Sequence, residues 1–482
     1  MLFNSFEFLI FFPIVVCLYY LIPNTLRQHW LLLASYYFYM SWNARYGLLI
    51  FTCTLVTYLL GIAIDNHRVH NGRIKNYVVI ASIFSISVLI YYKYSWYLIY
   101  VITKILHTNR VDFNIILPVG ISFYTFQSLG YVIDVYRQDV KAERNFFKYA
   151  LFISFFPQLV AGPIERSSKL LHQLGNTKPF DFENFREGLL YIVWGFFLKL
   201  VVADRSGLYV DYVYNNISKS NALNIIIATI LFAFQIYGDF GGYSAIAIGA
   251  AKILGIDLME NFNSPYYACS VADFWRRWHI SLNTWFRDYL YIPLGGNRKG
   301  TLRKILNQII VFGLSGLWHG ASVTYMIWGL TNGFMVIVSG ILKNDTNFRI
   351  SSPIINRFIK IMQILLTFIL VDFAWMFFRA QSMSNLIMII NKFSEGFKLN
   401  YISNAVIAEA LDEKNMLFLV ICIIIVMIID GFKYNNHNLK NIILSSKGYT
   451  WSIVCGATIV FILIFGIWGN AYKAADFIYF QF

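Results

Sequence analysis

The chain has 482 residues, of which 58% are hydrophobic, 18% aromatic and only 13% charged. Soluble domains carry about a quarter charged residues, so this composition excludes a water-soluble globular protein and predicts one embedded in a membrane. The formal net charge of +14 lies in short clusters between apolar runs, which favours basic loops beside anionic headgroups over a nucleic-acid-binding face. The five cysteines show no CxxC spacing, so neither a metal site nor a disulfide framework is predicted.

Apolar runs that are long enough to span a bilayer recur along the chain. Because backbone polar groups in lipid must bond within their own segment, such runs predict helices and therefore an all-α, polytopic transmembrane protein. The run at 8–26 follows no basic segment or cleavage site and is expected to be an uncleaved first span. Some runs are short or tilted, so about 11 to 13 spans are expected. The candidate spans are 6–23, 28–42, 46–64, 76–92, 94–106, 115–135, 148–163, 186–203, 222–238, 240–256, 305–320, 322–342, 358–378, 414–430 and 450–470.

Residues 262–304 interrupt this pattern, because charges and large aromatic residues alternate at close intervals. Asp273 and Arg277 have the i,i+4 spacing of a helical ion pair, and Trp275 and His279 are expected to share a helix face. Such a segment lies flat at the membrane interface or re-enters the membrane to line a polar cavity. A basic cluster without an acidic residue closes the segment and predicts a cytoplasmic loop; its members are Arg298, Lys299, Arg303 and Lys304.

Polar residues inside other apolar runs are predicted to form buried structural pairs or helix-end anchors. They are Asp239, Asp204 with Arg205, and Asp372 with Arg379. Glycines surround Asp239, and no phosphate-binding motif accompanies them. They therefore predict a closely packed or kinked helix.

His319 stands out in the sequence. Residues 305–342 contain no Asp, Glu, Lys or Arg, and His319 is their one group that ionises near neutral pH. An ionisable residue in such a run is a functional-site hypothesis; the alternative is a neutral histidine hydrogen-bonded to a neighbouring helix. A neutral imidazole is a suitable general base for a hydroxyl that attacks an ester or thioester.

Several segments resemble the membrane-bound O-acyltransferase family, and within it the bacterial alginate O-acetyltransferase branch. The resemblance covers about residues 1–390, with teichoic acid D-alanyl transferases as more distant relatives. It is most specific along the Arg-Arg-Trp-His stretch that ends at His279. The matching segments are 118–127, 156–164, 239–244, 264–268, 273–282, 284–298, 317–321 and, more weakly, 377–380.

The resemblance implies one membrane-embedded domain over residues 1–482, with a signature core at about 115–345 and C-terminal helices at about 358–470. Its helices are expected to form a ring around a central funnel. His319 matches the family's catalytic histidine. His279 matches a second signature position that many relatives fill with Asn, which implies orienting the acyl carbonyl rather than taking a proton. Substrate contacts are expected from Trp278, Trp318, Asn283, Arg276 and Asp239, and donor-phosphate contacts from Arg298, Lys299, Arg303 and Lys304.

The implied reaction moves an acyl group, acetyl in this branch, from a cytoplasmic thioester such as acetyl-CoA across the bacterial cytoplasmic membrane. The final acceptor is an extracytoplasmic polysaccharide. The chain has no GxSxG elbow and no sizeable soluble domain, so a separate extracytoplasmic acetyltransferase is an expected partner. No bound cofactor or metal is expected.

Two alternatives remain at this point. The donor could be a D-alanyl carrier-protein thioester rather than acetyl-CoA. The chain could also be a non-enzymatic transporter of a glycan or an acyl donor, although it lacks matching interrupted helices in two corresponding halves.

Overall fold

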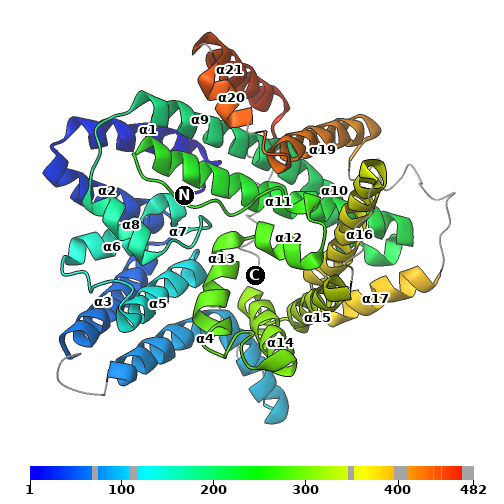
Figure 1. The fold of residues 1–482 in the computed structure, drawn as a ribbon, viewed down its shortest axis with the longest axis horizontal. Coiled ribbons are helices and arrows are strands. Elements are labelled where there is room, and N and C mark those ends of the chain that lie inside the picture. The colour runs from blue at the N-terminus through cyan, green and yellow to red at the C-terminus, as the bar shows by residue number, and fades with distance from the viewer. Residues whose placement is uncertain are drawn as a thin grey trace. The chain divides into compact units, whose positions relative to one another are not determined.

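The computed structural model describes residues 1–67, 74–108, 117–345, 352–395, 411–437, 439–446 and 448–468. Every regular element in these ranges is helical, which confirms the all-α prediction (Figure 1). Among them, seven helices are long and apolar enough to cross a membrane, so the chain is a multi-pass membrane protein. These are α3 (Ala44–His67), α4 (Ile74–Ile105), α11 (Ala222–Ile253), α15 (Val323–Asp345), α16 (Pro353–Arg379), α19 (Glu413–Tyr434) and α21 (Gly448–Phe465).

Shorter helices connect or accompany these seven. A helix of this length crosses the membrane only when its tilt and its connection to a neighbouring helix allow it, so the expected 11 to 13 spans stay a prediction. The shorter helices are α1 (Phe6–Leu21), α2 (Asn24–Met40), α5 (Ile121–Arg137), α6 (Phe146–Ser154), α7 (Phe156–Leu159), α8 (Ser167–Gly175), α9 (Phe182–Phe196), the π-helix η1 (Phe197–Ala203), α10 (Asp204–Asn215), η2 (Ile217–Lys219), η3 (Pro265–Tyr267), α12 (Val271–Arg277), α13 (Ile280–Phe286), the π-helix η4 (Arg287–Tyr291), α14 (Gly300–His319), α17 (Met383–Ser394) and α20 (Leu439–Ser445).

Two helices are longer than the apolar runs predict. The sequence suggests breaks near Lys93 and Asp239, but α4 and α11 each continue through them. A charged side chain interrupts the apolar run without removing a backbone hydrogen bond, and neither position holds a proline. The prediction of separate spans is therefore wrong at both places.

The run 148–163 shows the opposite difference, because it is broken where one span is predicted. α6 ends at Ser154, Phe155 is non-helical, and α7 begins with Pro157 in its first turn. Proline has no N–H to donate and disfavours the α-conformation in the residue before it. The break at Phe155 lies two residues before this proline, although a proline alone does not end a helix, since Pro13 lies inside α1.

Internal packing divides the chain into two compact units. The first comprises 1–194 and 243–260, and the second comprises 195–242 and 261–482, within the described ranges. In the first unit, α5 is buried on most of its surface. The side-chain amide of its Gln127 donates to the Phe152 carbonyl of α6 at 2.7 Å, so a polar contact ties the two helices together inside an apolar core.

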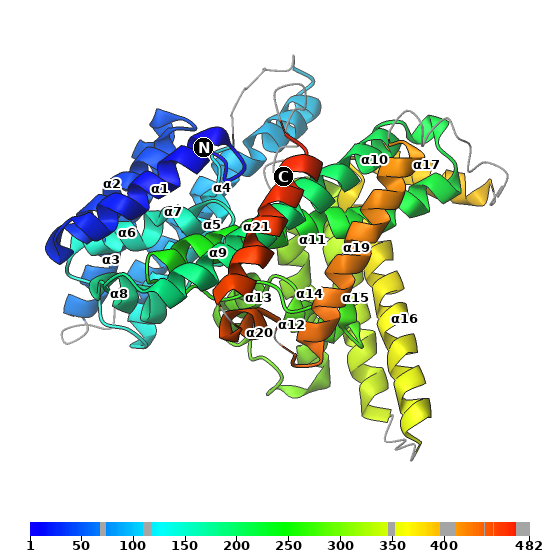
Figure 2. The same cartoon turned by 90° about the horizontal axis from the view of Figure 1, so that it is seen from above.

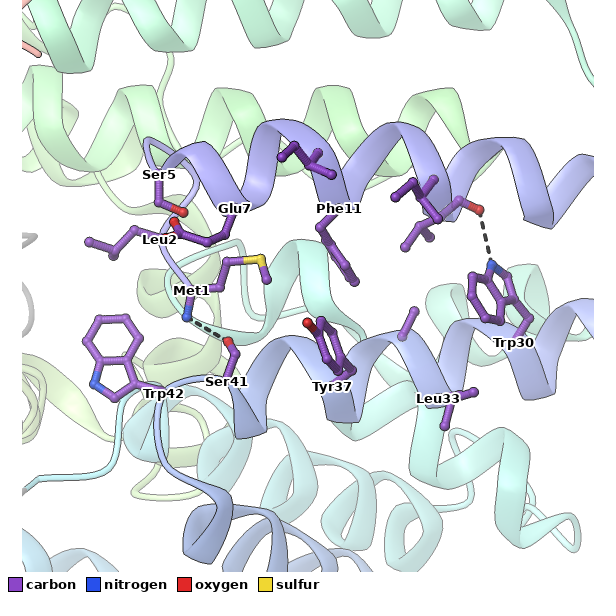
Figure 3. A pocket seen from close by; sticks show the side chains of 14 residues that line it. Met1, Leu2, Ser5, Glu7, Phe11, Trp30, Leu33, Tyr37, Ser41 and Trp42 are labelled. Atoms are coloured by element: carbon purple, nitrogen blue, oxygen red, sulfur yellow. Dashed lines mark hydrogen bonds between the residues drawn. The ribbon is translucent and has the colours of Figure 1, made fainter. Parts of the chain in front are cut away.

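A groove of about 1010 Å³ lies between α1 and α2 in the first unit (Figure 3). At one end the Met1 amine donates to Ser41 Oγ at 2.9 Å, and toward the other Trp30 Nε1 donates to the Val15 carbonyl at 3.1 Å. Most of its lining is apolar; it contains no histidine, and its ionisable groups are Glu7 and the Met1 amine.

In the second unit α14 packs against α15, and α15 packs against α16 (Figure 2). Glycines set the distance between α14 and α15. A Cβ added to Gly316 would lie 2.4 Å from the Tyr325 carbonyl oxygen, and one added to Gly329 would lie 2.3 Å from the Phe312 carbonyl oxygen. Backbones approach this closely only where side chains are absent. Because His319 is the last residue of α14, this contact fixes where its side chain enters the core.

We predict that Gly316→Ala lowers the free energy of unfolding by about 1–3 kcal/mol, because the new methyl group forces α14 and α15 apart. Thermal unfolding of the detergent-purified protein, followed by tryptophan fluorescence, measures the change. Gly313→Ala is the matched control one turn earlier on α14, where the added Cβ would meet only Leu330 Cδ2 at 3.6 Å. Equal unfolding temperatures for the two variants would show that the contact is not close-packed.

Candidate active site

His319 lies in a pocket made of aromatic side chains. It is 4% exposed, and its ring meets Trp328 of α15 at a centroid distance of 5.0 Å and Phe378 of α16 at 5.2 Å, both edge to face. Trp318, its neighbour on α14, lies 4.7 Å away. Three aromatic side chains thus contact the imidazole. The next residue, Gly320, sits against the Tyr325 ring, where a Cβ would lie 2.7 Å from a ring carbon.

His279 occupies a break between α12 and α13. Its backbone is left-handed, with φ 44° and ψ 54°, and it is 1% exposed. Residues before α12 hold this break: the Ile280 N–H donates to the Asn261 carbonyl at 3.0 Å, and the Asn263 N–H donates to the Arg277 carbonyl at 3.0 Å. Asn adopts the left-handed conformation more readily than most side chains. The backbone therefore gives a physical reason why Asn is accepted at this signature position.

The break corrects one prediction from helical spacing. Trp275 and His279 do not share a helix face, because α12 ends at Arg277. Trp275 instead donates from Nε1 to Asn332 Oδ1 of α15 at 3.2 Å. The predicted ion pair of Asp273 with Arg277 lies within α12 and is confirmed at 3.1 Å.

Trp318 contacts both histidines. Its ring centroid lies 6.3 Å from that of His279 and 4.7 Å from that of His319. On another side, the ring of Phe240 from α11 meets His279 edge to face at 4.6 Å. The structure therefore brings together His279, His319 and Trp318 from two of the predicted signature segments, 273–282 and 317–321.

The other predicted substrate contacts lie in different surroundings. Trp278 is 1% exposed and packs on Trp375 at 5.1 Å within an aromatic cluster. Asn283 donates from Nδ2 to the Trp278 carbonyl at 2.6 Å and so caps the break that holds His279. The Arg276 side chain is 67% exposed and lies 3.4 Å from Asp273. Trp278 and Asn283 thus support the His279 backbone, whereas Arg276 is on the surface.

Asp239 pairs with a lysine that the sequence reasoning passed over. Lys199 Nζ lies 2.7 Å from Asp239 Oδ1 and 2.8 Å from Asp204 Oδ1, and all three side chains are buried. The structural pair expected for Asp239 is confirmed, while its contact with substrate stays a prediction. Lys199 is the one charged residue in 188–203, and a lone charge in an apolar run is the signal that identifies it.

The glycines around Asp239 are confirmed as a close helix contact. A Cβ on Gly238 would lie 2.8 Å from the Leu198 carbonyl oxygen, and one on Gly242 would lie 2.7 Å from the Gly195 carbonyl oxygen. α11 therefore packs backbone to backbone against the segment that carries Lys199.

Arg379 and Asp204 lie in structural pairs, as expected, and their partners come from elsewhere in the chain. Arg379 binds Asp211 of α10 at 2.6 Å; Asp372 is two helical turns away from it, roughly 10 Å along the axis. Arg205 donates to the Phe465 carbonyl of α21 at 2.7 Å. Asp204, its neighbour in sequence, forms an ion pair with Lys199 instead.

The basic cluster follows η4 in a turn that contains three glycines with positive φ, at positions 295, 296 and 300. Arg298, Lys299 and Arg303 are exposed, and Lys304 is half-buried. Arg303 donates from Nε to the Leu294 carbonyl at 3.2 Å, and the buried Asn307 donates to the Gly296 carbonyl at 2.9 Å. The turn is thus anchored to α14 and presents positive charge to the surface. In the described part of the chain, no three His, Cys, Asp or Glu residues are grouped so as to hold a metal ion.

Comparison with known proteins places this site in a family. The sequence model of the membrane-bound O-acyltransferase family matches residues 74–374. The chain belongs to this family. It is therefore an acyltransferase, and the histidines, Trp318 and the Lys199 group all lie inside the matched region.

Individual relatives agree with this assignment. The chain is 37% identical to the alginate O-acetylase AlgI of Pseudomonas putida, over 80% of this chain and 78% of that protein. It is 34% identical to the peptidoglycan O-acetyltransferase of Helicobacter pylori, over 75% of this chain and 72% of that protein. The chain is 28% identical to the teichoic acid D-alanyltransferase of Bacillus subtilis, over 55% of this chain and 69% of that protein.

We predict that Asn283→Ala lowers the free energy of unfolding by about 1–3 kcal/mol, because the buried Trp278 carbonyl loses its donor. Thr284→Ala is the control, since it also removes a side-chain bond to a carbonyl, that of Ser281 at 2.9 Å, within the same helix. Thermal unfolding of both variants checks the prediction. An Asn283→Ala protein as stable as the Thr284→Ala protein would mean that the cap does not hold the His279 break.

Proposed function

We propose that this acyltransferase moves an acetyl group from a cytoplasmic thioester, such as acetyl-CoA, through the bacterial cytoplasmic membrane to O-acetylate an extracytoplasmic polysaccharide. The observation that carries the proposal is the buried His319, whose ring contacts Trp318, Trp328 and Phe378, with Trp318 also in contact with His279. Similarity to an alginate O-acetylase and a peptidoglycan O-acetyltransferase supports acetyl as the group and a polysaccharide as the acceptor.

In the proposed reaction, His319 accepts the proton of the acceptor hydroxyl as its oxygen attacks the thioester carbonyl. The new C–O bond forms, the C–S bond breaks, and the proton returns from His319 to the thiolate that leaves. His279 orients and polarises the acyl carbonyl, and Trp318 lies against both rings. A positioned general base of this kind contributes about 10²- to 10⁴-fold to the rate.

We infer that a second protein takes part. The sequence has no GxSxG nucleophile elbow with which to perform a further transfer. An extracytoplasmic acetyltransferase would receive the acetyl group and deliver it to the polysaccharide. The relatives support two candidate polysaccharides, alginate and peptidoglycan.

The basic cluster is proposed as the donor-phosphate contact on the cytoplasmic face. Three of its four side chains are exposed, and the turn that carries them is fixed to α14 by Arg303 and Asn307. Fixed positive charge on an ordered turn attracts the phosphates of a coenzyme A thioester. The same charges also serve as topogenic signals, which need no ligand.

We predict that Arg298→Gln combined with Lys299→Gln raises KM for acetyl-CoA about tenfold and leaves kcat within about twofold, since two surface charge contacts are lost. Steady-state kinetics of the purified protein with S-acetylpantetheine, which lacks the nucleotide phosphates, supplies the control. The variant and the wild type should have the same KM for that donor. An unchanged KM for acetyl-CoA would leave the cluster a topogenic signal only.

For the central residue, we predict that His319→Ala lowers ester-linked acetate on extracytoplasmic glycan at least about 100-fold in cells with matched membrane levels of the protein. Acetate released by mild alkali is the measurement. His29→Ala, which removes an exposed histidine of α2, is the control and should retain wild-type acetate. Wild-type acetate from His319→Ala cells would reduce His319 to a packed core residue.

The same alkaline release distinguishes the D-alanyl alternative, which the similarity to a teichoic acid D-alanyltransferase keeps open. Release of D-alanine instead of acetate would replace the acetyl donor by a D-alanyl thioester and leave the role of His319 intact. If the protein were instead a non-enzymatic transporter, its transport of a glycan or an acyl donor would persist in the His319→Ala cells.

A further inference from the structure

Each of the two site histidines rests on a phenylalanine ring in the same manner. Phe240 meets His279 at 4.6 Å and Phe378 meets His319 at 5.2 Å, each with an interplanar angle of 77°. Edge-to-face contacts of this kind restrict how far a ring can tilt. The two phenylalanines come from different helices, α11 and α16. Their positions therefore help to decide where the two imidazoles point.

Each phenylalanine also has a charged neighbour in sequence, and both neighbours pair with one helical segment. Asp239, which precedes Phe240, pairs with Lys199 of η1 at 2.7 Å. Arg379, which follows Phe378, pairs with Asp211 of α10 at 2.6 Å. η1 and α10 are continuous, so residues 197–215 make both pairs.

The π-helical geometry of η1 explains how Lys199 serves this purpose. In an α-helix a residue and the fifth residue after it point in different directions, whereas π-helical i→i+5 bonding places them above one another. Lys199 and Asp204 are five residues apart, and their charged atoms are 2.8 Å apart. The ammonium group is thereby held in place by its own segment while it also binds Asp239 across the close contact with α11.

The Arg379 contact is reinforced as well. The guanidinium lies over the Tyr214 ring of α10 at 5.3 Å while it binds Asp211. A planar guanidinium held by a carboxylate on one side and an aromatic face on another has little freedom to rotate.

We propose that residues 197–215 form a brace that positions both histidines. Lys199 holds Asp239, and with it Phe240, against His279; Asp211 holds Arg379, and with it Phe378, against His319. In this proposal the four charged residues are positioning residues, so Asp239 takes this role in place of the substrate contact that the resemblance implies. The catalytic consequence rests on the proposed function, whereas the effect on the two imidazoles does not.

The test uses two carboxylate-to-amide variants, which keep a side-chain oxygen at each position, and the buried Arg379 still has the Tyr214 ring beside it when Asp211 is changed. Asp239→Asn keeps Lys199 paired with Asp204, and Asp211→Asn changes a side chain that is 43% exposed. Asp257→Asn is the matched control, because it removes one of the two carboxylates around Lys252, another lysine between two acids. The full-length purified protein is treated with diethyl pyrocarbonate, and modification of each histidine is followed by peptide mass spectrometry. Acetyl-CoA kinetics are measured on the same preparations.

We expect Asp239→Asn to speed modification of His279 at least about fivefold and to leave His319 unchanged. Asp211→Asn should speed modification of His319 by the same factor and leave His279 unchanged. In both variants kcat should fall about 10- to 100-fold with KM within twofold, as for a small misplacement of reacting groups. Asp257→Asn should change neither quantity.

A double variant separates positioning from substrate contact. If Asp239 acts through Phe240, Asp239→Asn added to Phe240→Leu causes no further loss of kcat, whereas additive losses would overturn that half of the proposal. Wild-type modification rates and kcat in both single variants would overturn the brace altogether. If the modification rates change as expected but the protein transfers no acyl group, the brace stands and the proposed function is refuted.

Discussion

In a hydrocarbon environment a polar group must find its partner inside the protein, and this constraint organises the structure. It makes every regular element of the described residues helical, and it collects buried charges into pairs. The Lys199 group shows the effect most clearly, because an ammonium and two carboxylates are buried together where α11 and η1 meet backbone to backbone. Glycines permit that approach, and the ion pair gives it a fixed register.

The same constraint separates the neutral site from the charged scaffold. His279 and His319 contact aromatic rings, and two of these rings, Phe240 and Phe378, stand next in sequence to the paired charges Asp239 and Arg379. A neutral imidazole is the form that accepts a proton. In the proposed brace, the paired charges act on the two imidazoles through these phenylalanines.

Composition was enough to predict the fold class, and the uncharged run around His319 made that residue a candidate, whose catalytic role stays a prediction. The family resemblance added His279, and the structure brings the two together around Trp318. Helical spacing failed at His279, because a left-handed residue between two short helices leaves no periodic signal. Lys199 was not predicted, because one charged residue does not prevent an apolar run from being interpreted as a transmembrane span. Pairing partners such as Asp211 for Arg379 come from different helices, which no local pattern encodes.

The central claim is that His319 is the base for acyl transfer from a thioester, and purified protein in liposomes tests it most directly. Release of free coenzyme A thiol from acetyl-CoA, in the presence of a soluble hydroxyl acceptor, is compared between the wild type and His319→Gln. Glutamine preserves size and hydrogen bonding but cannot take up the proton. The account predicts steady thiol release by the wild type and none above background by the variant. Equal release by both proteins would contradict it.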